Sequence, residues 1–159
     1  MKILIFSVRV TCPAMSTWPA EVSYLLDTNV ISELRKRTPD RHVLAWHRSQ
    51  SGADAFISTL VVGEIGQGIE RLRRRDLQQA EALERWLTGL ISAYRDRILP
   101  LTLEVAQEWG RLNVPPGPPP VIDGLIAATA RVHRLTLVTR NVADVARTGV
   151  PVLNPFDPT

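Results

Sequence analysis

Short apolar runs alternate with amphipathic stretches along the chain. Residues 22–26 form an apolar run rich in strand-forming residues, and Asp27 closes it just before a segment with helical character. Residues 55–58 show a second buried-strand pattern, followed by a helix expected from about Thr59 to Arg75. The pattern therefore predicts two strand-to-helix units in succession.

The same alternation continues to the end of the chain. Between residues 76 and 96, apolar side chains recur at spacings of three and four, which is typical of a long amphipathic helix. Five prolines within residues 114–120 exclude regular hydrogen-bonded structure there. Strands separated by helices indicate an α/β fold with a central, mostly parallel β-sheet flanked by helices on both faces. The remaining elements are expected as helices over 42–47, 102–113 and 121–132, and as strands over 98–99, 135–139 and 150–153.

Composition limits the kinds of protein this chain can be. Its 159 residues, 45% of them hydrophobic, suit one domain with a sizeable core. Cys12 is the only cysteine, which excludes an internal disulfide and a cysteine-rich zinc site and fits a cytoplasmic location. The net charge of +3 suits a polyanionic partner without proving one. No apolar run approaches the roughly 20 residues that span a bilayer, so we expect no membrane association.

The N-terminal segment departs from the pattern of the rest. Residues 1–22 are expected to be a loosely ordered extension or the product of a misplaced start, with Met15 as a rival initiator. Residues 3–8 faintly resemble a signal peptide, but Arg9 interrupts the apolar run early, so a periplasmic location is the weaker alternative. We expect the organised domain to occupy residues 23–157.

Two acidic residues of the first half lie in apolar surroundings. Asp27 follows the first strand, where α/β sheets gather their ligand sites, although an N-cap role is the simpler explanation. Glu64 shares a helix face with Leu60, Val61 and Gly68, so its carboxylate points toward the core. A buried charge needs a partner, and an arginine or a metal ion would serve equally well.

Two further acids follow later elements. Asp123 lies in the first turn of the helix after the proline-rich segment, and Asp144 comes after the strand that ends at Thr139. Each alone could be a cap or a turn residue. A parallel sheet would bring Asp27, Asp123 and Asp144 to one edge, where carboxylates suit Mg²⁺ or Mn²⁺. Such a cation activates water and stabilises the charge that builds on a phosphodiester, so the predicted reaction is hydrolysis of a phosphate ester.

Four motifs occur in a fixed order along the chain. They are YLLDTNV at 24–30, STLVVGE at 58–64, VIDGLIAATA at 121–130 and LVTRNVAD at 137–144. A single motif is weakly specific, but four in this order are strongly so. Together they resemble those of VapC-type PIN-domain toxins, the ribonuclease components of type II toxin–antitoxin systems, and the resemblance covers about residues 23–157.

The resemblance implies a PIN fold and endoribonuclease activity that depends on Mg²⁺, with Mn²⁺ as a possible substitute. It also implies a homodimer, an RNA substrate and a cognate VapB-like antitoxin that inserts a segment into the active-site groove. By the family pattern, the acidic ligands are Asp27, Glu64 and Asp123.

The fourth acidic position is less uniform in the family pattern. Asp144 matches the commoner form and is the expected fourth ligand, with Asn141 in support. Asn141 itself stands where some relatives have an acid. Thr28 or Thr139 would bind water or orient a carboxylate.

Other functions are compatible with parts of the sequence. The segment around Asp27 loosely resembles that of phosphatases with an aspartyl nucleophile, but Asn29 stands where those enzymes need a second Asp. A catalytically silent module that binds RNA or an antitoxin is the other alternative. A basic cluster at the end of the Glu64 helix is either a solvated helix end or a site for RNA phosphates; it comprises Arg71, Arg73, Arg74 and Arg75.

Overall fold

The computed structural model describes residues 22–50 and 54–158, which build one five-stranded sheet. All four strand pairs are parallel, and the strand order is β3-β2-β1-β4-β5. The strands are β1 (Tyr24–Leu26), β2 (Ala55–Ser58), β3 (Ile98–Leu99), β4 (Thr136–Val138) and β5 (Val152–Leu153).

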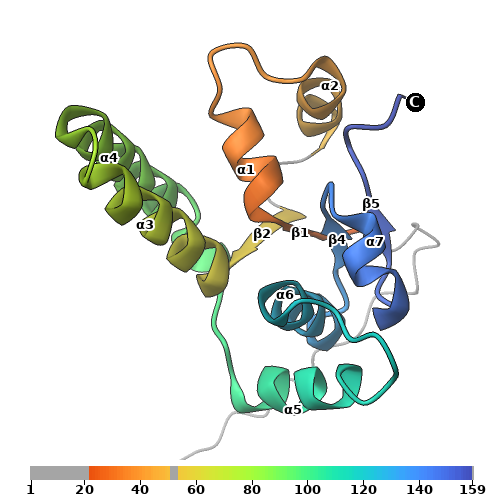
Figure 1. Ribbon diagram of the computed structural model, residues 1–159. Coiled ribbons are helices and arrows are strands. Elements are labelled where there is room, and N and C mark those ends of the chain that lie inside the picture. The colour runs from red at the N-terminus through yellow and green to blue at the C-terminus, as the bar shows by residue number, and fades with distance from the viewer. Residues whose placement is uncertain (1–21, 51–53, 159) are drawn as a thin grey trace, which may run out of the picture.

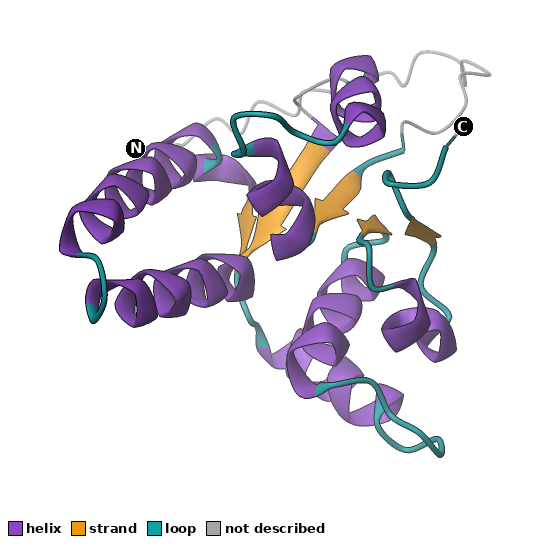
Figure 2. Cartoon of the chain, turned by 45° about the horizontal axis from the view of Figure 1, so that its top comes forward, coloured by secondary structure: helices purple, strands orange, loops and turns teal. Residues whose placement is uncertain are grey.

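Helices cover both sides of the sheet. Figure 1 shows α1 and α2 on one side and α5 and α6 on the other, while α3 and α4 form a hairpin that extends away from the domain. Figure 2 shows the same arrangement from a second direction, with the strands at the centre. The α-helices are α1 (Thr28–Leu34), α2 (Arg41–Ser49), α3 (Thr59–Arg73), α4 (Leu77–Ala93), α5 (Leu103–Leu112), α6 (Val121–Val132) and α7 (Val142–Val145).

The central strand sets the geometry of one edge of the sheet. In β1, Leu26 is fully buried and is aligned with Ile57 of β2 and Val138 of β4. The residues that follow these three therefore emerge side by side at the carboxyl edge, which is where parallel sheets bind their ligands. Asp27 and Thr139 are two of them.

Two strands pass into helices without a loop. Asp27 directly follows β1 and accepts a hydrogen bond from the backbone N–H of Thr28, the first residue of α1. Ser58 ends β2 and accepts a hydrogen bond from the backbone N–H of Leu60 in α3. Both are favourable N-cap residues, so the local sequence itself starts each helix at the sheet edge.

The observed architecture confirms the predicted α/β fold, and the sheet is wholly parallel in the part of the chain described. Residues 142–145 form the short helix α7, which was not among the elements expected from the sequence. None of the helices in the described ranges is long and apolar enough to cross a membrane. Residues 1–21 lie outside the described residues, and the predictions of an extension, a signal peptide or a start at Met15 lie there too.

Two helical glycines differ in the space around them, and this gives a test of the packing. A Cβ at Gly124 would lie 3.0 Å from Cγ of Pro119 and 3.3 Å from Cδ1 of Trp109, whereas nothing lies within 4 Å of a Cβ at Gly89. Alanine in place of glycine stabilises an open helix by about 0.5–1 kcal/mol. We expect Gly89→Ala to raise the free energy of unfolding by that amount, and Gly124→Ala to show no such gain. Chemical denaturation of both variants measures this, and an equal gain at Gly124 would contradict the close packing of α5 on α6.

Candidate active site

Three acidic side chains from separate elements line one cavity of about 270 Å³ at the carboxyl edge of the sheet. Asp27 follows β1, Glu64 lies in α3, and Asp123 lies in the first turn of α6. The structure thus brings together the three acids that the family resemblance names as ligands, and their role as ligands stays a prediction. The other lining residues are Thr28, Asn29, Ser32, Ile122, Ile126 and Asn141.

Asp27 is the most buried of the three acids, with 6% of its surface exposed. Its carboxylate accepts hydrogen bonds from Thr139 Oγ1 at 2.6 Å, from Asn29 Nδ2 at 2.5 Å and from the Thr28 backbone N–H at 2.7 Å. The N-cap and the site residue proposed from the sequence are therefore the same side chain. Oδ1 caps α1, and Oδ2 is held by Asn29 and Thr139.

Burial raises the pKa of Asp27 above its ordinary value, and the nearby charges of Asp123 and Glu64 raise it further. The hydrogen bonds from Thr139 and Thr28 oppose this rise but do not cancel it. A carboxylate in this position is thus costly to ionise unless positive charge is supplied nearby.

Glu64 is held by a hydroxyl group rather than by a cation. Thr28 Oγ1 donates a hydrogen bond to Glu64 Oε2 at 2.5 Å. Among the described residues no ion pair includes Glu64. Of the two partners considered from the sequence, the arginine is not observed, which leaves the carboxylate directed at the cavity with Thr28 as its support.

Asp123 reaches the cavity because α6 packs closely on α5. The neighbouring Gly124 is buried, and its lack of a side chain permits the contact with Pro119 and Trp109. Asp123 Oδ1 lies 3.5 Å from Nδ2 of Asn141, a long and weak hydrogen bond. Asp123 is therefore the least constrained of the three acids.

Asn141 and Asp144 are separated by the structure. Asn141 lines the cavity, whereas Asp144 is exposed on α7 and is not among the lining residues. The backbone N–H of Asp144 donates to the carbonyl of Asn141 at 3.2 Å, so one turn separates them. The role of Asp144 as fourth acid stays a prediction.

The donor set of the cavity suits a hard divalent cation. Three carboxylates, a threonine hydroxyl and asparagine amide oxygens are the ligand types that Mg²⁺ and Mn²⁺ prefer. In the described ranges no three acidic, histidine or cysteine side chains are close enough to form a finished metal cluster. Like charges repel, and each of the three carboxylates accepts a hydrogen bond from a neighbouring hydroxyl or amide donor.

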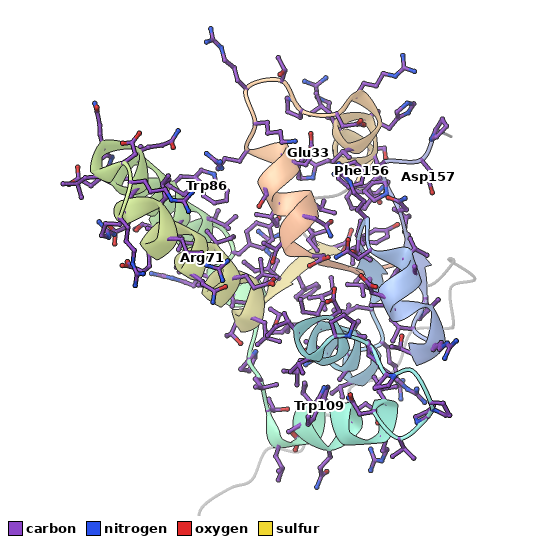
Figure 3. All side chains as sticks on the ribbon, viewed as in Figure 1. Glu33, Arg71, Trp86, Trp109, Phe156 and Asp157 are labelled. Atoms are coloured by element: carbon purple, nitrogen blue, oxygen red, sulfur yellow. The ribbon has the colours of Figure 1, made fainter. Side chains whose placement is uncertain are left out.

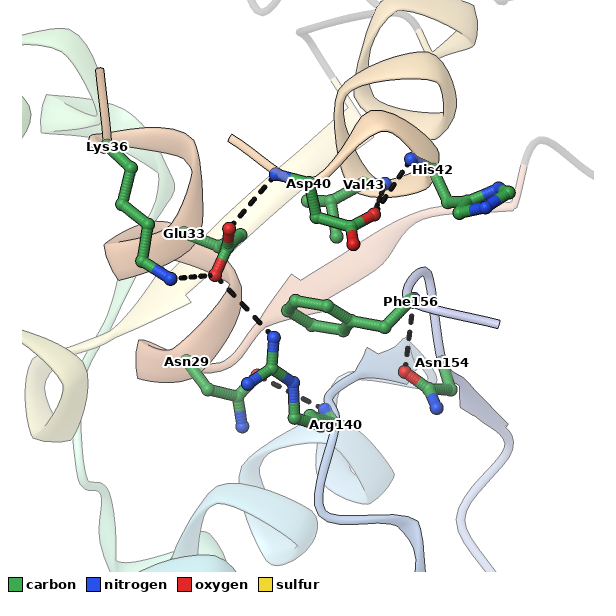
Figure 4. A network of polar contacts seen from close by, with 9 residues as sticks. All are labelled: Asn29, Glu33, Lys36, Asp40, His42, Val43, Arg140, Asn154 and Phe156. Carbon is green, nitrogen blue, oxygen red and sulfur yellow. Dashed lines mark hydrogen bonds and ion pairs between the residues drawn. The ribbon is translucent and has the colours of Figure 1, made fainter. Parts of the chain in front are cut away.

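A second group of residues fixes the positions of side chains around the cavity, and it was not predicted from the sequence. The Asn29 side chain donates to Asp27 and to Thr139 Oγ1, and its Oδ1 accepts from the backbone N–H of Arg140 at 3.1 Å. The Arg140 guanidinium lies 3.5 Å from Oε2 of Glu33 and stacks on the ring of Phe156 (Figure 4). The sequence feature that could have pointed to this group is Asn29, two residues after Asp27.

Glu33 anchors this group from within α1. It is 5% exposed, and it accepts hydrogen bonds from Lys36 Nζ at 2.6 Å and from the backbone N–H of Asp40 at 3.0 Å. The hydrogen bond from Lys36 is the main cause of a lowered pKa for Glu33, and the Asp40 N–H and the charge of Arg140 act in the same direction. The ionised form therefore stabilises the folded state.

The sign of this pKa shift gives a test by pH. Because the folded-state pKa lies below the ordinary value of 4.5, the stabilisation by Glu33 is complete above that pH and is lost as the pH falls through the folded-state pKa. We expect Glu33→Gln to lower the free energy of unfolding by about 1–3 kcal/mol at neutral pH, and the gap to the wild type to narrow below pH 4.5. Urea denaturation across this pH range measures it, with the exposed Glu81→Gln as control. A gap that stays constant with pH would show that the ionised form contributes nothing.

Comparison with known proteins agrees with this geometry. Residues 24–149 match the PIN domain family. The VapC ribonuclease Y4jK of Sinorhizobium fredii is 33% identical over 141 residues, which cover 84% of this chain and 98% of that protein. Toxin FitB of Neisseria gonorrhoeae is 32% identical over 83% of this chain and 97% of that protein. The crystal structure of FitAcB from the same organism matches with a TM-score of 0.78 at 32% identity, over 84% of this chain and 98% of that chain. The chain belongs to the PIN-domain family.

Proposed function

We propose that this protein is a metal-dependent endoribonuclease and the toxin of a VapBC-type toxin–antitoxin pair. The observation that carries the proposal is the convergence of Asp27, Glu64 and Asp123 on one cavity at the carboxyl edge of the sheet. The names of the relatives, a VapC ribonuclease and a toxin, support the substrate class and the biological setting.

The acids would hold Mg²⁺, with Mn²⁺ as a substitute. The cation supplies an activated water and stabilises the charge that develops on the phosphodiester. Asp27, Glu64 and Asp123 would hold it in the cavity. Thr139 and Asn29 fix the direction of the Asp27 carboxylate, and Thr28 fixes that of Glu64. These contacts limit the motion of two ligands before the ion arrives.

The partners follow from the solved relatives. The structures of FitAB and FitAcB are complexes of a toxin with a second protein, and FitAB is bound to a DNA fragment. We propose that this chain likewise binds a VapB-like antitoxin, forms a homodimer and acts on RNA in the cytoplasm. Its fold similarity to FitAB has a TM-score of 0.79 at 30% identity.

The alternative of a phosphatase with an aspartyl nucleophile is weakened by Asn29. Those enzymes need a second Asp at this position, whereas here the Asn29 side chain donates a hydrogen bond to Asp27. A phospho-aspartate trapped on Asp27 would support the phosphatase.

The first test is cleavage of total cellular RNA by the purified, antitoxin-free protein with Mg²⁺ or Mn²⁺. We expect cleavage that EDTA abolishes and that Asp27→Asn and Asp123→Asn each reduce by about 100-fold or more, because each removes a charged ligand. Asp96→Asn, an exposed acid away from the cavity, serves as the matched control. Cleavage that survives EDTA and both substitutions would overturn the proposal, and inactive but folded and metal-loaded protein would favour a silent binding module.

The fourth acidic position has a test of its own. We propose Asp144 for it, with Asn141 in support, and expect Asp144→Asn to lower the cleavage rate by about tenfold or more with a smaller effect of Asn141→Ala. Rates for the two variants under saturating metal give the comparison. The opposite order would assign the fourth position to Asn141, which lines the cavity.

A further inference from the structure

A hollow of about 370 Å³ lies at the far end of α3 from the sheet. It is lined by Gly68, Arg71, Leu72, Arg74 and Arg75, so three of its five residues are arginines. Figure 3 labels Arg71 on this helix, in the hairpin of α3 and α4. The hollow shares no residue with the acidic cavity, but both are built on α3.

The hollow and the cavity lie on one face of that helix. Glu64 and Arg71 are seven residues apart, which places them within about 20° of the same direction and about 10 Å apart along the axis. Gly68 lies between them, four residues from Glu64, and nothing lies within 4 Å of the position a Cβ would occupy. The surface between the acidic cavity and the arginines is therefore open.

The arginines of the hollow carry uncompensated charge. In the described part of the chain, Arg71, Arg74 and Arg75 are exposed and belong to no ion pair. Arg73 differs, because it binds Glu70 at 3.3 Å and Glu84 at 3.1 Å. The neighbouring acids thus neutralise the arginine outside the hollow and leave those inside it available to an anion.

We propose that a single RNA strand lies along this face of α3. The phosphate to be cut occupies the acidic cavity, and phosphates further along the strand bind Arg71 and Arg75. This inference rests on the proposed ribonuclease function and adds the path of its substrate. It accounts for the pairing of an acidic cavity, which by itself repels RNA, with unpaired cations on and just beyond the last turn of the helix that carries Glu64.

The contacts predicted are to phosphates, so they do not select a base sequence. They make affinity fall with salt, since each phosphate neutralised on a single strand contributes about −0.7 to the slope of log K against log salt. Loss of Arg71 and Arg75 together therefore predicts a slope less steep by about 1.4.

Binding is measured first, by fluorescence anisotropy of a labelled single-stranded RNA of mixed sequence in EDTA, where no metal-dependent cleavage occurs. The protein carries Arg71→Ala and Arg75→Ala together. The matched control is Arg37→Ala with Arg48→Ala, two exposed arginines that form no ion pair among the described residues. We expect weaker binding and the shallower salt slope in the first variant, and wild-type values in the control.

Cleavage is measured second, with Mg²⁺ or Mn²⁺ and two substrates, a dinucleotide and a longer strand. The Arg71 and Arg75 variant is expected to raise KM for the longer strand and to leave kcat/KM for the dinucleotide unchanged. Gly68→Leu fills the open path and is expected to act like the arginine variant. Gly110→Leu, at another exposed helical glycine with nothing within 4 Å, is its control.

The outcomes separate this inference from the function on which it rests. If the wild type cleaves RNA and the arginine variant matches the control pair in salt slope and in KM, the path along α3 is wrong and the ribonuclease stands. If nothing is cleaved but binding still depends on Arg71 and Arg75, the proposed enzyme fails and the RNA surface stands. If the variant binds and cleaves RNA like the control pair but no longer binds the purified antitoxin, the arginines bind an acidic protein segment. The proposed RNA path is then overturned.

Discussion

A buried negative charge at the end of the central strand organises this structure. Asp27 is 6% exposed, and its carboxylate is surrounded by a threonine hydroxyl, an asparagine amide and a backbone N–H. Burial, together with the nearby Asp123 and Glu64, outweighs the hydrogen bonds from Thr139 and Thr28, so the pKa of Asp27 lies above its ordinary value. The negative charge of the Asp27 carboxylate is thus only partly compensated by its hydrogen-bond donors. A divalent cation is the kind of ligand that would compensate the rest.

The donors that hold Asp27 are themselves held by long-range contacts. Asn29 connects Asp27 to the backbone of Arg140, beyond β4, and the Arg140 side chain connects Glu33 of α1 to Phe156 near the C-terminus. One chain of polar contacts therefore joins α1, the end of β4 and the C-terminal segment around the carboxyl edge. A substitution at Glu33 would therefore change the positions of the residues that hold Asp27, although Glu33 does not line the cavity.

Much of the fold can be predicted from the sequence, because the spacing of the apolar residues indicates the helices and strands directly. The strand Ala55–Ser58 and the helix Val121–Val132 have the predicted bounds, and the end of β1 at Leu26 was predicted as well. The approach of Asp27 to Thr139 also follows, since parallel strands end at one edge. Strand order does not follow, because periodicity within a segment carries no information about which segments pair.

The contacts missed from the sequence have the same cause. The hydrogen bond between Asn29 and Arg140 depends on the register of β1 with β4, and that register is fixed by packing between residues more than a hundred positions apart. The separation of Asp144 from Asn141 depends on a single turn of helix at 142–145, too short for a hydrophobic period to reveal. Sequence reasoning could therefore name the acids but could not decide which later residue faces them.

The position of α3 has a consequence for how a polyanion could be handled. The helix begins at the sheet edge, contributes Glu64 to the cavity and ends at the unpaired arginines. One element therefore sets the distance between the acidic cavity and the positively charged side chains. Opposite charges on a flexible loop would collapse onto each other. Glu64 and Arg71 lie about two turns apart on α3 and form no ion pair among the described residues, so both stay available to a strand that carries one charge per phosphate. Separation of the opposite charges along one helix is therefore what allows a cavity that repels phosphate to work beside a surface that attracts it.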